Sequence, residues 1–148
     1  MDEATFPTTI LVVTDGKDPA RRALRMAGEL AAATGSALQV AHIKLVARGI
    51  YPDFLSERQV ARIESEARAS LEDDLAFLRG RGVEAAGGAV RLGRLDARTL
   101  ELADEVAAGL IVIPNRMGDA FERVLLGDET ESVARHARCP VLVVRGGE

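Results

Sequence analysis

The segment from Pro114 to Thr130 follows an apolar run at 110–113, where α/β proteins often hold a phosphate group. It reads PNRMGDAFERVLLGDET and leads into a helical pattern. A phosphate cradle uses glycines, because backbone N–H groups can then approach the oxygens without a Cβ in the way. This segment instead offers a proline, a methionine and two acids near its ends. The segment is therefore either an anion-binding site or a former anion-binding site that has lost this function.

Further candidate residues stand at the ends of two earlier apolar runs. Thr14 and Asp15 end the run at 9–14, and Ile43 lies near the end of the run at 37–44. Ligands of open parallel sheets bind beyond the carboxyl ends of the strands, so these residues could share a site with the segment from Pro114. Asp15 could equally serve an Asp-Gly turn, and Ile43 could equally be core. Both interpretations stay open.

The elements that must position these residues alternate between strands and helices. Aliphatic runs predict buried strands at 9–14, 37–44, 83–92, 110–113 and 141–144. Helical spacing and capping residues predict helices that begin at Asp18-Pro19, after Ser56, at Asp96 and at Asp128, and the third stops at Gly109. Such crossovers imply parallel pairing. The predicted fold is one α/β domain over residues 1–148, an open, doubly wound sheet with helices on both faces.

The composition argues against several classes of function. The 19 basic and 23 acidic residues are interspersed and give a net charge of −4, which disfavours duplex nucleic acid and anionic membranes as partners. The apolar runs are shorter than a membrane span of about 20 residues, and MDEATFP lacks the apolar core of a signal peptide, so a cytoplasmic location is expected.

The sequence also offers no recognisable set of residues for catalysis or for metal binding. A single cysteine, Cys139, excludes an internal disulfide and a Cys-rich metal site. The only histidines are His42 and His136, and no Ser-His-Asp set, metal-ligand spacing or activated cysteine can be assembled. We therefore expect no catalytic residues and no metal ligands.

Two stretches resemble the universal stress protein family. Ile10-Leu-Val-Val-Thr-Asp15-Gly16, followed by an alanine-rich helix, resembles the family's first strand and aspartate. LLG at 125–127 and VARHARCPVLVVR at 133–145 resemble its last helix and strand. The resemblance covers nearly the whole chain and implies a UspA-like, Rossmann-like fold of the adenine nucleotide alpha hydrolase type, with strand order 3-2-1-4-5. It also implies an adenine-nucleotide pocket formed by Thr14, Asp15, Ile43, Gly127 and Thr130.

The sequence departs from the motif of the family's ATP-binding members, Gly-x-x-Gly, nine residues, then Gly and Ser or Thr. Pro114 and Met117 stand at the first two glycines, Gly127 is retained, and Asp128 replaces the hydroxyl. Proline removes an N–H group and methionine adds a long side chain. A carboxylate ~4 Å from a phosphate repels it by ~4 kcal/mol at an effective dielectric constant near 20. The departures favour a degenerate pocket in a non-enzymatic stress-response module with at most residual ATP hydrolysis and no expected cofactor.

An alternative is a working pocket for ATP or AMP with Mg²⁺. Gly118 lies one residue beyond the expected glycine, Arg116 and Arg123 could supply positive charge, and Mg²⁺ could convert Asp128 into a ligand. Two enzyme-like or signalling readings are not favoured. A receiver domain would need an acceptor aspartate where the third strand runs into Arg91-Leu92-Gly93, and a haloacid-type phosphatase would need a second acid after Asp15-Gly16.

The last apolar run suggests an assembly. If Val141, Leu142, Val143 and Val144 form an edge strand, a hydrophobic row of unpaired backbone groups would face water. Pairing with a symmetry-related copy would cover that row. The family resemblance implies the same homodimer through the last strand.

Overall fold

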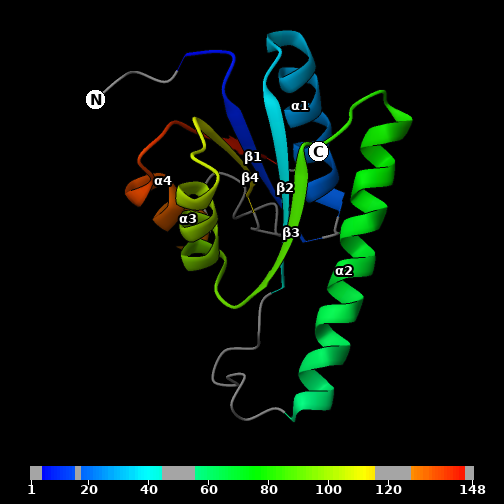
Figure 1. Ribbon diagram of the computed structural model, residues 1–148. Helices are drawn as coiled ribbons and strands as arrows, with labels where there is room; N and C mark the ends of the chain where they lie inside the picture. Colours follow the sequence, from blue (N-terminus) through cyan, green and yellow to red (C-terminus); the bar gives the residue numbers. More distant parts are fainter. Residues whose placement is uncertain (1–4, 16–17, 45–55, 116–127, 146–148) are drawn as a thin grey trace.

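The first strand lies at the centre of a five-stranded parallel sheet. β1 (Thr9–Thr14) pairs with β2 (Ala37–Lys44) on one side and with β4 (Leu110–Pro114) on the other. β3 (Gly87–Leu92) pairs with β2, and β5 (Val141–Val144) pairs with β4. This arrangement is seen in a computed structural model that describes residues 5–15, 18–44, 56–115 and 128–145 (Figure 1). The order β3-β2-β1-β4-β5 confirms the one that the resemblance implied.

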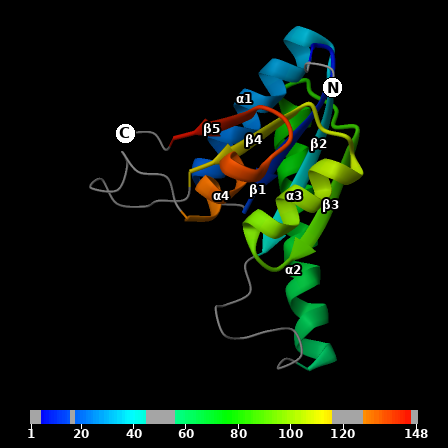
Figure 2. The same ribbon diagram turned by 90° about the vertical axis from the view of Figure 1, so that its left-hand side faces the viewer.

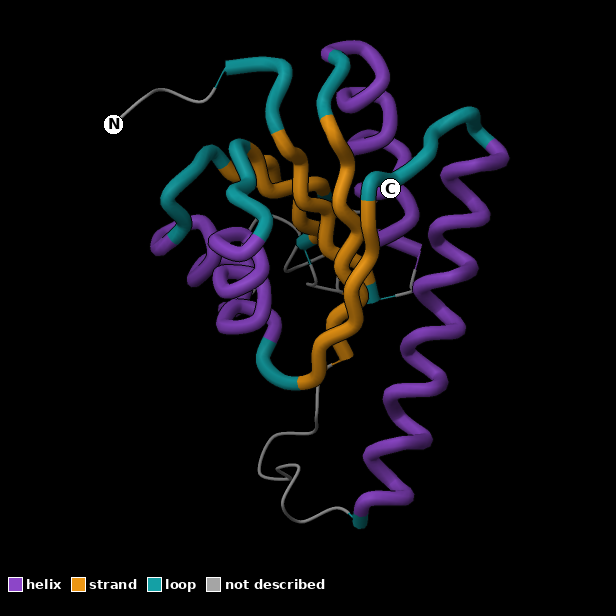
Figure 3. The backbone as a smooth tube through the Cα atoms, viewed as in Figure 1, coloured by secondary structure: helices purple, strands orange, loops and turns teal. Residues whose placement is uncertain are grey.

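Helices cover both faces of the sheet. α1 (Asp18–Thr34) and α2 (Glu57–Gly80) pack on one face, and α3 (Leu95–Glu105) and α4 (Asp128–His136) pack on the other (Figure 2). Successive residues of a strand point to opposite faces. Ile10 and Val12 therefore join the core under α1 and α2, whereas Leu11 and Val13 join the core under α3 and α4. The sheet therefore separates two apolar clusters, and Figure 3 shows its strands between the helices of the two faces.

Local sequence signals set the ends of α2 as predicted. Ser56 Oγ accepts a 3.1 Å hydrogen bond from the Gln59 amide, and Gln59 Oε1 accepts one of 2.8 Å from the Ser56 amide. This is the predicted capping box. After α2, Gly82 has a φ of 81°, which suits the left-handed turn that ends many helices.

The predicted start of the third strand was wrong. β3 begins at Gly87 rather than at Val83. Val83 is used elsewhere, because its amide donates to the Leu78 carbonyl in the turn that ends α2.

The predicted ends of the third helix were also wrong. The helix begins at Leu95, with Arg94 at the N-cap position and Asp96 already inside the first turn. It ends at Glu105 rather than at Gly109, because the chain leaves the helix through a turn in which Ala107 has a φ of 54°. The cap that allows the early start comes from α4 and is described below.

α1 and α2 approach closely at Gly28. A Cβ at this position would lie 3.1 Å from Leu78 Cδ2 and 3.4 Å from Val83 Cγ2. The amino-terminal part of α2 runs past the sheet, whereas its later part covers it (Figure 1). The buried residues of α2 are accordingly Ala67, Leu71, Asp74 and Leu78. In the described part of the chain, no helix combines the length and the apolar character needed to cross a membrane.

Candidate functional site

The carboxyl ends of the inner strands bring most of the predicted site residues to one edge of the sheet. Thr14 is the last residue of β1, Asp15 follows it, and Ile43 lies one residue before the end of β2. Pro114 ends β4 next to Val144 of β5. Gly127 and Met117 fall outside the described residues. We call this region the carboxyl edge.

Most candidate side chains at this edge are closed off from solvent. Thr14, Ile43 and Thr130 are 1%, 0% and 0% exposed, whereas Asp15 is half-buried. Of these four, only Asp15 could contact a ligand without movement of its surroundings. The structure therefore brings the candidates together but does not leave them on an open surface.

Thr130 ties the start of α4 to the end of β4. Its Oγ1 donates a 3.4 Å hydrogen bond to the Pro114 carbonyl. The Thr130 hydroxyl, which the family resemblance places in the nucleotide pocket, thus makes a contact within the protein. Asn115, which follows β4 and is 4% exposed, is a second buried polar residue at this edge. Sequence reasoning missed it, although an amide directly after a buried strand was a visible signal.

The first turn of α4 is acidic, and one of its acids caps α3. Asp128 is exposed, but Glu129 Oε2 accepts a 2.8 Å hydrogen bond from the Leu95 amide. Helix N-termini leave amides without intrahelical partners, and a carboxylate satisfies them well. The expectation that Asp96 caps this helix was wrong, because Asp96 instead accepts from Ala97 and Arg94 inside the first turn.

Charge is concentrated where the first turns of α3 and α4 meet. Burial opposes ionisation of Asp96, but hydrogen bonds from Arg94, Ser132 and the Ala97 amide outweigh it and lower the pKa of Asp96. The hydrogen bond and charge of Asp96 raise the pKa of Arg94, and the charges of Glu129 and Asp128 add to this effect. Among the described residues here, the Arg94 guanidinium therefore stands among three carboxylates, those of Asp96, Asp128 and Glu129.

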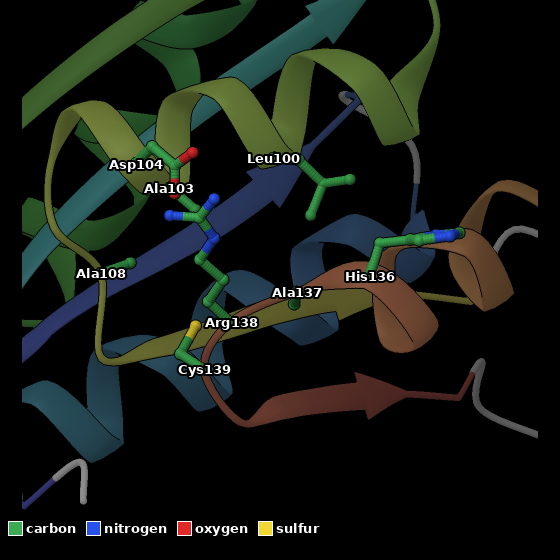
Figure 4. Close-up of a pocket in the computed structure, with 8 residues that line it drawn as sticks. All are labelled: Leu100, Ala103, Asp104, Ala108, His136, Ala137, Arg138 and Cys139. Atoms are coloured by element: carbon green, nitrogen blue, oxygen red, sulfur yellow. The ribbon is translucent and has the colours of Figure 1, made fainter. Parts of the chain in front are cut away.

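A separate hollow of about 190 Å³ lies at the amino ends of β4 and β5, between α3 and α4 (Figure 4). Its lining comprises Leu100, Ala103, Asp104, Ala108, His136, Ala137, Arg138 and Cys139. None of the predicted nucleotide-pocket residues belongs to it. Burial raises the pKa of the Cys139 thiol, which favours its protonated form.

No group of three or more His, Cys, Asp or Glu side chains within the described ranges could hold a metal ion. His136, one of the two histidines, lies with its Nδ1 3.0 Å from the Ser132 carbonyl of its own helix.

The model of the universal stress protein family matches residues 7–145 of the chain. The chain belongs to this family. A universal stress protein of Thermus aquaticus is 33% identical over 151 aligned residues, which cover 93% of this chain and 98% of the relative. The match thus extends over nearly the full length of both proteins.

Solved universal stress proteins share the fold. One in complex with cAMP is 28% identical, with a TM-score of 0.62 and coverage of 94% of this chain and 97% of that one. The universal stress protein from Archaeoglobus fulgidus in complex with dAMP is 26% identical, with a TM-score of 0.67 and coverage of 95% and 99%. Each of these two relatives was solved with an adenine nucleotide that carries one phosphate.

Proposed function

We propose that this universal stress protein is a non-enzymatic stress-response module whose carboxyl edge no longer holds ATP with the strength of the family's ATP-binding members. The observation that carries the proposal is the first turn of α4. Asp128 is exposed there, and Glu129 is committed to the Leu95 amide. Thr130 is committed to the Pro114 carbonyl.

Because of these contacts and charges, the first turn of α4 lacks the features that bind a phosphate. A helix N-terminus attracts phosphate through free N–H groups and the positive end of the helix dipole. Here the acids of the first turn counter that dipole, and Pro114 contributes no N–H. An exposed carboxylate ~4 Å from a phosphate opposes binding by ~4 kcal/mol at an effective dielectric constant near 20, which is about three powers of ten in affinity.

A second candidate function is the binding of an adenine nucleotide, ATP or AMP with Mg²⁺, with weak or no hydrolysis. The relatives solved with cAMP and dAMP favour a ligand with a single phosphate. Asp15, half-buried at the carboxyl edge, would meet the ribose and base, with Thr14, Ile43, Gly127 and Thr130 around it. A single phosphate meets less repulsion from Asp128 than three do.

Titration calorimetry separates the two functions. We expect no saturable heat with ATP at about millimolar concentration, with or without Mg²⁺, and saturation at tens of micromolar would contradict the proposal. Asp128→Ser restores the family's hydroxyl and should strengthen ATP binding by at least about tenfold. Glu131→Ser, a loss of charge on the same helix, is the matched control and should change ATP binding less. AMP and cAMP titrated in parallel test the second candidate.

We also propose a homodimer that forms through β5. This strand ends the sheet order, and Val141, Leu142 and Val143 are each only partly buried in one copy of the chain. An apolar edge strand invites pairing with another strand, and a two-fold interface is the commonest way to satisfy it. The test of this interface is given in the Discussion.

A further inference from the structure

Three ionisable side chains from three elements meet in the interior beneath α1 and α2. Asp74 of α2 is 1% exposed, and His42 of β2 is 3% exposed. His42 Nδ1 lies 3.9 Å from Asp74 Oδ2, and Arg21 Nε of α1 lies 3.7 Å from Asp74 Oδ1. We call Arg21, His42 and Asp74 the buried charge cluster.

The three side chains of the cluster lie close together but are not joined by hydrogen bonds. Within the described residues, Arg21 Nε, His42 Nδ1 and Asp74 Oδ2 are buried atoms without a hydrogen-bond partner. Separations of 3.7 and 3.9 Å are too long for such bonds. A buried polar atom without a hydrogen-bond partner is energetically unfavourable, so a hydrogen-bond partner would stabilise this site.

Arg21 neutralises Asp74 only in part. Its side chain is 42% exposed, and its guanidinium also lies over the Phe77 ring, 4.7 Å from the ring centroid. Solvent therefore screens much of its charge. His42 is the one member of the cluster that can gain a positive charge in the closed interior.

Among the described residues, the nearest strand neighbours of His42 carry little competing charge, since Lys44, which follows on the same face of β2, is exposed. The register partners of His42 are Thr14 on β1 and Val90 on β3, and neither carries a charge. Of the two packed helices, α1 contributes Arg21 and α2 contributes Asp74. Arg21 repels a proton on His42 and Asp74 attracts it, but Asp74 is buried with the imidazole whereas Arg21 reaches solvent.

We propose that the buried charge cluster is a proton-sensitive clasp that fastens α2 to the sheet. A proton taken up by the free ring nitrogen of His42 makes the ring cationic, with both nitrogens as N–H donors. Nδ1–H can then close on the Asp74 carboxylate as a charge-assisted hydrogen bond. Protonation of His42 thus holds the middle of α2 more tightly on β2, next to Ile43. The clasp does not depend on nucleotide binding.

Histidine ring resonances followed by NMR against pH test the clasp directly. In Asp74→Asn, the His42 ring should hold its proton less tightly than in the original chain, because the attracting carboxylate is gone. His136 is exposed on α4 and serves as the internal reference, with an unchanged midpoint. Asp73→Asn removes an exposed acid from the same helix and should move neither histidine. Equal His42 midpoints in the original chain and in Asp74→Asn would overturn the proposal.

Hydrogen exchange of the original chain provides a second readout. After correction for the intrinsic rates, the amides of 71–78 should exchange at least about threefold more slowly near pH 6 than near pH 8. His42→Gln keeps a polar side chain that cannot gain charge, so this pH dependence should vanish. If the original chain shows the same α2 protection at both pH values, the proposal is wrong, whether or not the variants fold.

Discussion

The Leu95 amide donates a 2.8 Å hydrogen bond to Glu129 Oε2, although the two residues stand 34 positions apart in the chain. The bond joins the amino end of α3 to the first turn of α4. Arg94, at the N-cap position of α3, makes no side-chain cap of its own. One helix therefore depends on another for its start, and the start of α4 is fixed by the same contact.

Glu129→Ala should lower the free energy of unfolding by about 1–2 kcal/mol, the usual cost of losing a helix cap. Urea unfolding followed by circular dichroism measures this change. Glu131→Ala is the matched control, because Glu131 forms only an exposed ion pair of 2.9 Å with Arg135. Its expected cost is below about 0.5 kcal/mol. Equal costs for the two variants would show that Glu129 is not a cap.

Asp96 should make the protein sensitive to acid. Its pKa is lowered in the folded protein, so the unfolded chain binds the proton more readily. Its contribution to stability is complete above the unfolded value of about 3.9 and is lost as the pH falls through the lower folded value. Unfolding midpoints measured across this range should fall less steeply in Asp96→Asn. A variant as acid-sensitive as the original chain would contradict this assignment.

Cys139 should react slowly with thiol reagents. Burial raises the pKa of its thiol and the charge of Asp104 raises it further, so less thiolate is present at neutral pH. With Ellman's reagent near pH 8, the folded protein should react at least about tenfold more slowly than the protein in urea. Equal rates would mean that the thiol is open to solvent and ionises freely.

The β5 edge can be tested by removing one outward-facing amide. The Pro140 carbonyl accepts from the Ile111 amide of β4, and the Val144 carbonyl accepts from the Asn115 amide directly after β4. Alternation along the strand therefore places the N–H and C=O groups of Val143 on the outer side. Val143→Pro should abolish the proposed dimer while leaving the bonds to β4. Light scattering should then give 15.8 kDa, against about twice that mass for the original chain. Val143→Ala keeps the amide and should remain dimeric, and an original chain that is already monomeric would refute the interface.

The sequence predicted most elements because their signals are local. Aliphatic runs marked β1, β2 and β5 with the bounds that the structure has. The capping box at Ser56 was equally visible, since both partners lie within four residues. Strand order was different, because it depends on pairing between distant segments and came only from the family resemblance.

The contacts that sequence reasoning missed are long-range or break a pattern. The cap from Glu129 is one such contact, because nothing local in the sequence shows that this side chain reaches Leu95. Asp74 was overlooked because acids on helices are normally solvated. It nevertheless occupies the same helical face as Leu71 and Leu78, and a carboxylate on an apolar stripe was a signal that could have been followed. Burial of Thr14 and Ile43 at the carboxyl edge likewise required the packed structure.

The lack of a side chain at Gly28 lets α1 and α2 approach each other closely on that face of the sheet. A methyl group there would lie 3.1 Å from Leu78 Cδ2, so the Leu78 side chain of α2 would have to shift by a few tenths of an ångström. Leu78 lies one turn beyond Asp74, and Gly28 lies two turns beyond Arg21. A methyl group added to α1 at Gly28 would therefore disturb the packing of α2 one turn away from the ionic contact between Arg21 and Asp74, although position 28 does not touch that contact.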